Sequence, residues 1–192
     1  MNSLIARVHR GANWPLITLF LLPAFAVQYL LIAEYLPVFL DFSQGLMNPD
    51  QLFCYDSVYL EQLYRELGDP GRSHYKDMLR LDYLYMALAG IGYALLIAKL
   101  ERKGTALIGL PLMMLIFDAL ENTLQIQLLN GYPSFPATWI ELSSLASSLK
   151  MVMGLIAMLY LLLLIIRSSY RFMLNPKKSS LFNKEATQDQ SP

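Results

Sequence analysis

A group of carboxylate and carboxamide side chains lies inside an apolar stretch of the sequence, in the segment "DALENTLQ". The four residues are spaced i, i+3, i+4, i+7, which puts them on one face of a helix. Two acids this close compete for charge, so sharing one cation leaves one ionised and favours protonation of the other. The pattern suits general acid–base chemistry or proton-coupled binding, and it equally suits a structural network between helices. The residues are Asp118, Glu121, Asn122 and Gln125.

The last apolar segment of the chain supplies a cation for these acids. Lys150 directly precedes a long uncharged run, and Ser147 lies one turn before it on the same helical face. Counted from Glu141, Lys150 lies about 13 Å further along a helix, close to the depth expected for Asp118 and Glu121. We therefore predict that Lys150 is their counter-ion.

The predicted site has three catalytic candidates and a set of ligand-binding candidates. Asp118 or Glu121 would donate or accept a proton, and Lys150 would be the charge partner. Asp82 and Tyr85 belong to an earlier apolar helix and are expected to enter the same half of the protein. The predicted ligand-binding residues are Asn122, Gln125, Asp82, Tyr85, Glu141 and Ser147.

Four apolar runs must position these side chains. The chain is 55% hydrophobic and only 16% charged, which is too apolar for an ordinary soluble domain of its length. The uncharged run 104–117 is only about 21 Å long as a helix. It cannot cross a hydrocarbon core of about 30 Å, so its helix must carry Asp118 into the membrane. We predict an all-α bundle of four transmembrane helices at about residues 14–36, 75–98, 105–129 and 140–166.

Basic residues predict the orientation of the bundle. They gather before the first helix, between the second and third, and after the fourth, so both termini are expected in the cytoplasm. The outer loop between the first two helices carries "SVYLEQLYREL", residues 57–67, whose spacing predicts a short amphipathic helix. Residues 1–174 are predicted to form the membrane domain and residues 175–192 a disordered cytoplasmic tail. The absence of an Asn-x-Ser/Thr motif favours a bacterial inner membrane.

Several classes of function are disfavoured by the residues present. Cys54 is the only cysteine, so an intrachain disulfide and a thiolate metal site are excluded. There is no nucleophile elbow, HExxH motif or glycine-rich phosphate loop, and a net charge of zero offers no footprint for nucleic acid. An all-oxygen Mg²⁺ or Ca²⁺ site is disfavoured by the nearby lysine. We expect no metal and no cofactor. The acids that could make such a site are Asp82, Asp118, Glu121 and Glu141.

Two resemblances concern this arrangement. Asp-x-x-Glu-Asn at residues 118–122, followed by Lys150 in the last helix, resembles a set of uncharacterised bacterial four-helix membrane proteins and implies no activity. The outer segment "LYRELGDPG" followed by three more helices resembles the EXPERA group of sterol isomerases and the sigma-2 receptor. That group implies a four-helix core that binds sterol-like amines through intramembrane acids, with Asp82 near its second-helix acid. Here "YLYMALAGIGYALL" replaces that group's aromatic, proline-rich second helix, so this likeness is one of architecture.

The function predicted from these observations is a polytopic membrane protein in contact with membrane lipids. Its intramembrane acid and lysine site would bind or chemically modify an amphipathic, lipid-like small molecule. The alternative is a non-enzymatic structural or accessory subunit whose polar network holds the helices together. A small transporter comes third, because the sequence shows neither an inverted repeat nor a pair of broken helices.

Overall fold

The protein is a bundle of long helices in the computed structural model, which describes residues 3–101 and 106–174. Helices are the only regular elements in these two ranges. Four of them are long and apolar enough to cross a membrane, covering Trp14–Phe42, Ser57–Leu100, Ala106–Gly131 and Ala137–Arg171. The elements in order are α1 (Ser3–Gly11), α2 (Trp14–Leu30), the π-helix η1 (Leu31–Tyr35), α3 (Leu36–Phe42), the 3₁₀-helix η2 (Pro49–Gln51), α4 (Ser57–Leu100), the 3₁₀-helix η3 (Ala106–Gly109), α5 (Leu110–Gly131) and α6 (Ala137–Leu174).

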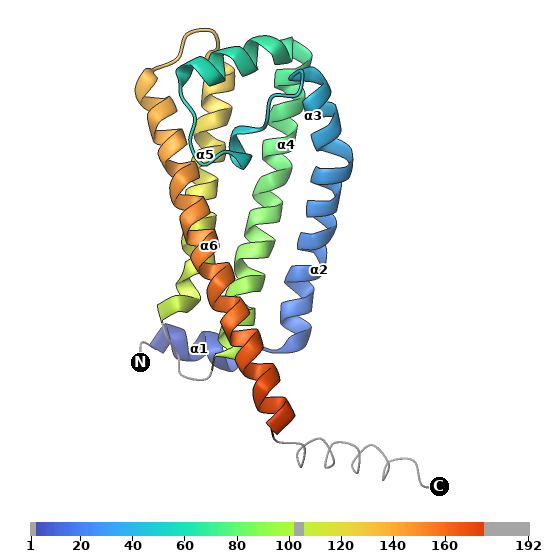
Figure 1. The fold of residues 1–192 in the computed structure, drawn as a ribbon, viewed down its shortest axis with the longest axis vertical. Coiled ribbons are helices and arrows are strands. Elements are labelled where there is room, and N and C mark those ends of the chain that lie inside the picture. The colour runs from blue at the N-terminus through green and yellow to red at the C-terminus, as the bar shows by residue number, and fades with distance from the viewer. Residues whose placement is uncertain (1–2, 102–105, 175–192) are drawn as a thin grey trace, which may run out of the picture.

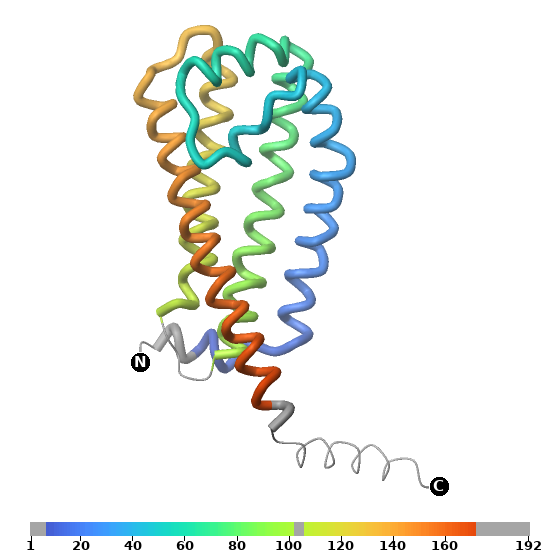
Figure 2. The backbone as a smooth tube through the Cα atoms, viewed as in Figure 1, coloured from blue at the N-terminus to red at the C-terminus, as the bar shows by residue number. Residues whose placement is uncertain are grey.

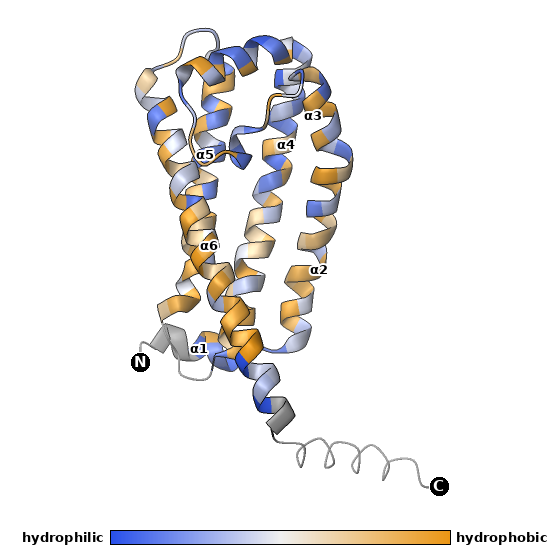
Figure 3. Cartoon of the chain, viewed as in Figure 1, coloured by the Kyte–Doolittle hydropathy of each residue, from blue (hydrophilic) through white to orange (hydrophobic). Residues whose placement is uncertain are grey.

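The bundle has two distinct ends. The short helix α1 and the last turns of α6 lie at one end, and the connections between α3 and α4 and between α5 and α6 lie at the other (Figure 1). We call the second the loop end. Helix α2 and the later half of α6 consist mostly of hydrophobic residues, while hydrophilic residues are concentrated at the loop end (Figure 3). The predicted cytoplasmic placement of the termini and the predicted tail at 175–192 are not tested by this arrangement, and the tail lies outside the described residues.

Helix α4 combines the predicted outer helix and the second predicted span. Asp56 caps its first turn by accepting a hydrogen bond from the Tyr59 backbone N–H at 2.8 Å. Gly68 then breaks the helix with φ 58° and ψ −174°, a conformation that favours glycine. Arg72 donates to the Tyr64 carbonyl at 2.5 Å and satisfies a carbonyl of the turn before the break. Residues 57–67 therefore run across the loop end before α4 turns into the bundle (Figure 1).

The polypeptide between α3 and α4, residues 43–56, does not stay on the surface of the bundle. It turns back into the space beside α6, passes through η2 and returns to the loop end, as the tube in Figure 2 shows. We call residues 43–56 the strap. Its first turn has positive φ at Gln44 (54°) and Gly45 (84°), and the Gly45 N–H donates to the Leu40 carbonyl at 2.8 Å, which ends α3.

Two apolar clusters close the ends of the bundle. The larger one, at the loop end, packs residues of α3, of both segments of α4, and of α5 and α6. The smaller one lies at the other end, around Ile97 and Ile108. Between them α2 and α4 approach closely at Gly92, where an added Cβ would lie 2.5 Å from Leu21 Cδ2. The helices are thus fixed at their ends and at this crossing, which leaves room for a cavity between them.

Candidate functional site

Lys150 of α6 is the centre of a buried ionic cluster. Its Nζ lies 2.6 Å from Glu121 Oε2 and 3.3 Å from Asp118 Oδ1. It also pairs with the carboxylate of Asp50 and donates to the Asp50 backbone carbonyl at 3.2 Å. Removing an ammonium and carboxylates from water is costly, and this close pairing offsets the cost. Three acids surround one cation, so the cluster holds more carboxylates than positive charges.

The sequence explains how α5 and α6 bring these groups together. Each helix has a buried polar face, and a connection of only five residues, 132–136, makes them neighbours. On α6, Ser143 and Ser147 are completely buried, and their small side chains let the two helices approach. The polar faces therefore meet at the level of Asp118 and Lys150, as the spacing predicted.

Asp50 is the site residue that sequence reasoning missed. It lies in η2 of the strap, and the Asn48 side chain accepts a hydrogen bond from its backbone N–H at 3.1 Å. The signal in the sequence is the turn-forming "NPD" between apolar residues, but the acids of the outer loop all look alike in the sequence. Only the return of the strap into the bundle distinguishes Asp50 from Asp41 or Asp56, which are exposed.

Asp82 of α4 occupies the other side of the site and has a neutral partner. The Asn122 Nδ2 donates to Asp82 Oδ2 at 2.7 Å. In the described part of the chain no ion pair is formed by Asp82. The carboxamide oxygen of Asn122 is buried and accepts no hydrogen bond from the described residues. Asp82 therefore lies near the buried ionic cluster, but none of the described cations pairs with it.

A second polar network lies beside the ionic cluster, toward the loop end. The Tyr55 hydroxyl contacts Ser143 Oγ at 2.7 Å, accepts from Gln125 Nε2 at 2.8 Å and donates to Glu121 Oε1 at 3.3 Å. Tyr64 donates to Gln125 Oε1 at 2.7 Å. Burial, and then the nearby Glu121 carboxylate, raise the pKa of Tyr55 above its ordinary value of 10, so the phenol stays protonated. This network holds the strap, α4, α5 and α6 together.

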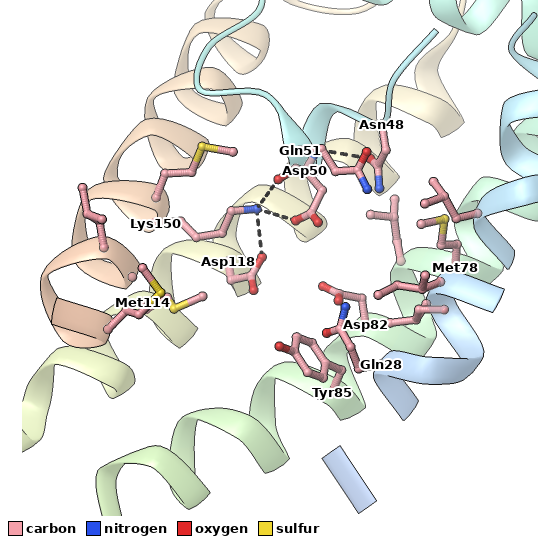
Figure 4. A pocket seen from close by; sticks show the side chains of 18 residues that line it. Gln28, Asn48, Asp50, Gln51, Met78, Asp82, Tyr85, Met114, Asp118 and Lys150 are labelled. Atoms are coloured by element: carbon pink, nitrogen blue, oxygen red, sulfur yellow. Dashed lines mark hydrogen bonds and ion pairs between the residues drawn. The ribbon is translucent and has the colours of Figure 1, made fainter. Parts of the chain in front are cut away.

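A cavity of about 460 Å³ lies next to the ionic cluster. Figure 4 shows Asp118 and Lys150 on one side of it, Asp82 and Tyr85 on the other, and Asp50 of the strap above. Its remaining walls are mostly apolar, and Ile32, Leu155 and Met158 are more than half exposed. The cavity therefore opens through the apolar flank of the bundle, between η1 and α6. The other lining residues include Gln28, Leu31, Leu36, Met78, Met114, Met151 and Gly154.

The structure separates the predicted site residues into three groups. Those that line the cavity are Asp82, Tyr85, Asp118 and Lys150. Those that contact a lining residue from behind are Glu121 and Asn122. Those that lie elsewhere are Gln125 in the second network, Ser147, whose hydroxyl donates to the Leu52 carbonyl of the strap at 2.7 Å, and Glu141, which is exposed beside a separate hollow.

Three of the carboxylates are close enough to share a hard cation. One oxygen each of Asp50, Asp82 and Asp118 lie within 4.8 Å of one another. Oxygen ligands of this kind suit Mg²⁺ or Ca²⁺, but Lys150 already pairs with Asp50 and Asp118. The sequence suggested Asp82, Asp118, Glu121 and Glu141 as possible oxygen ligands. In the structure Asp50 joins Asp82 and Asp118, and Glu121 and Glu141 are not part of the group. Lys150 is the cation that the described residues supply to this cluster.

Comparison with known proteins adds no family to this description. No protein-family model, curated protein or solved structure matches the chain.

Proposed function

We propose that this polytopic membrane protein binds an amphipathic, lipid-like small molecule in the cavity beside Lys150. The observation that supports the proposal is the cavity itself, which joins a cluster of carboxylates to apolar walls. Its volume of about 460 Å³ lies within the range of small-molecule sites in proteins, roughly 300 to 1,000 Å³. Its opening lies on an apolar flank, so a molecule dissolved in the bilayer would reach it without crossing water.

The charges around the cavity favour one kind of polar head. Lys150 is surrounded by three acids and has no unshared charge to offer an anionic head. Asp82 faces the cavity, and its hydrogen-bond partner among the described residues is Asn122. The site therefore suits a head that donates hydrogen bonds or carries positive charge, with the apolar part of the molecule against Leu155 and Met158. Asp50, Asp82 and Asp118 are the acids that line the cavity and could exchange a proton with a bound substrate.

The proposal is tested by narrowing the cavity mouth. Leu155→Trp places a large side chain on a residue that lines the cavity, whereas Leu159→Trp makes the same change one turn further along α6, outside the lining. The two leucines are similarly exposed, at 54% and 51%, so the cost to the fold should be similar. Mass spectrometry of molecules that co-purify in mild detergent should show a species retained by the wild type and L159W and lost in L155W. Identical profiles in all three proteins would overturn the proposal.

A structural role is the second candidate, and a specific observation favours it for part of the site. Gln125 is completely buried and bonded on both its oxygen and its nitrogen, and none of its partners Tyr55, Tyr64 and Ser143 lines the cavity. This network needs no ligand to explain it. If the carboxylates at the cavity likewise served only to hold the helices together, the protein would be a structural or accessory subunit.

The placement of the protein in the cell belongs to the proposal as well. We propose a bacterial inner membrane, with both termini in the cytoplasm, from the distribution of basic residues. A reporter that is active only in the cytoplasm, fused after the last residue and separately within the strap, tests the orientation. Activity of the terminal fusion alone is expected, and activity of the strap fusion alone would reverse it. The likeness to bacterial four-helix proteins and to the EXPERA architecture remains a proposal of the same kind.

A further inference from the structure

A row of polar contacts attaches the strap to α6. Ser147 Oγ donates to the Leu52 carbonyl at 2.7 Å, and Ser148 Oγ donates to the Phe53 carbonyl at 2.6 Å. The Tyr55 backbone N–H donates to Ser144 Oγ at 2.9 Å. These bonds come from successive positions along one side of α6. With the Lys150 contacts to Asp50, they hold the strap over about two turns of the helix.

The two ends of the strap are anchored independently of these contacts. The first end is fixed at the close of α3, where Gln44 and Gly45 have positive φ. An added Cβ at Gly45 would meet nothing within 4 Å, so the chain there is open to its surroundings. The second end is fixed by the Asp56 cap of α4. Asn48 is held to α4 as well, since it accepts from the Tyr75 hydroxyl at 2.9 Å. The part of the strap that can leave α6 by breaking polar bonds, without unfolding either neighbouring helix, is therefore the stretch that follows Asn48.

The middle of the strap forms the wall of the cavity at the loop end. Asn48, Asp50 and Gln51 all line it, and Figure 4 shows them above Asp82 and Asp118. Asp50 has two roles, because it lines the cavity and its carboxylate pairs with Lys150. Breaking this pair removes the charged contact of the strap with α6 and leaves the bonds to Ser144, Ser147 and Ser148 to be broken.

We propose that the strap is a lid over the cavity, latched by Asp50 on Lys150, and that lifting it opens the polar end of the cavity to water at the loop end. The inference rests on the proposed function, because it assigns a gate to the same cavity. The cavity then has two entrances of different character. One is the apolar mouth between η1 and α6, and the other is the lid, through which an ion or a water-soluble group would pass.

The lid can be tested by thiol access to the cavity, which requires no ligand. Cys54, the only cysteine, is exposed on the strap and is first replaced by Ser. Met114→Cys then places a thiol on the cavity wall. In lipid nanodiscs a charged, membrane-impermeant thiol reagent should modify this thiol slowly. Asp50→Asn should speed the modification by about tenfold or more, since it removes the charge from the latch.

Two further variants make the thiol test decisive. Asp56→Asn is the matched control, because Asn also caps a helix and residue 56 does not contact Lys150. It should leave the rate unchanged. Ser147→Ala removes one strap bond and leaves every carboxylate in place, so it keeps the test valid if D50N does not fold, and it should speed modification by a few-fold.

The rates also separate this inference from the proposed function. Equal rates in the parent, D50N and S147A, or a parent rate as fast as that of an exposed thiol, would overturn the lid. Faster modification in D50N and S147A would support the lid even if no molecule co-purified with the protein. If L155W lost the bound species while D50N and S147A were modified at the parent rate, the cavity ligand would be supported and the lid rejected.

Discussion

The Nζ of Lys150 lies 2.6 Å from Oε2 of Glu121, and both side chains are buried. They come from the neighbouring helices α5 and α6, whose polar faces meet at this level. In a medium of low polarity such a pair is held by its mutual attraction, and neither member tolerates the loss of the other. Substitutions at this ion pair and at the nearby Asp82 therefore distinguish a structural role of the cluster from a functional one, through their effects on stability.

Lys150→Met should destabilise the protein strongly. It leaves the acids Glu121 and Asp118 buried without a cation, and breaking a buried pair by removing one partner costs about 3 to 5 kcal/mol. Thermal unfolding in detergent should show a clearly lowered Tm. Lys99→Met, at an exposed position of α4, is the control and should change the Tm little. Adding Glu121→Gln to K150M should recover part of the loss, and no recovery would contradict this account.

Asp82→Asn should leave stability unchanged or raise it by up to about 1 kcal/mol. Asparagine keeps an oxygen that accepts from Asn122, and the change removes a negative charge close to Asp50 and Asp118. The same variant should lose the species that co-purifies with the wild type, because the head would no longer meet a charged acceptor. The comparison needs one Tm measurement and one mass spectrum. A marked fall in Tm would show that Asp82 serves the fold instead.

The sequence predicted the helices and several residues of the site, Asp82, Asp118 and Lys150 among them, for physical reasons. Charges are rare in a membrane helix, so the spacing of Asp118 and Glu121 and the isolation of Lys150 stand out against an apolar background. Long apolar runs likewise predicted four spans, although the first helical stretch extends to Phe42 rather than to about residue 36. Charged residues in an apolar background and long apolar runs can be recognised in a sequence without knowledge of the tertiary fold.

The part of the site that comes from the strap could not be predicted, because its residues are ordinary ones for a loop. Asp50 lies among several acids of a polar segment, and nothing local indicates that the strap re-enters the bundle. Glu141 shows the opposite error of the same kind. Its distance along α6 is compatible with the site, but its side chain is exposed beside another hollow. Helical spacing predicts which residues share a face, whereas the partner of that face depends on tertiary packing.

Gly92→Ala should destabilise the protein by about 1 to 3 kcal/mol. The new Cβ would lie 2.5 Å from Leu21 Cδ2 and 3.3 Å from Phe20 Cβ, so either the Leu21 side chain must change its conformation or α2 must move away from α4. Gly109→Ala is the matched control, because a Cβ there meets nothing within 4 Å and its φ of −73° suits any residue. The Tm of G109A should equal or exceed that of the wild type. Equal Tm values for the two variants would show that this crossing does not limit packing.

Tyr55 makes stability depend on alkaline pH. Its pKa is raised in the folded protein, first by burial and then by the Glu121 carboxylate, above the ordinary value of 10. Below pH 10 the phenol is protonated in both states, so its contribution to stability is fully present. As the pH rises above 10 the unfolded chain releases the proton first, and the contribution is progressively lost as the pH approaches the folded pKa.

Tyr55→Phe isolates this effect, because it keeps the ring and removes the hydroxyl. Near neutral pH the variant should lose about 1 kcal/mol, the usual net worth of such a hydrogen bond, while Ser143 and Tyr64 still hold Gln125. In unfolding measurements from pH 8 to above pH 10, the gap between wild type and Y55F should shrink on the alkaline side. The ultraviolet absorbance of tyrosinate, followed in the same samples, should show one phenol fewer titrating late in Y55F. A gap that stays constant across the titration would mean that the Tyr55 hydroxyl is not held protonated by its contacts with Glu121 and Gln125.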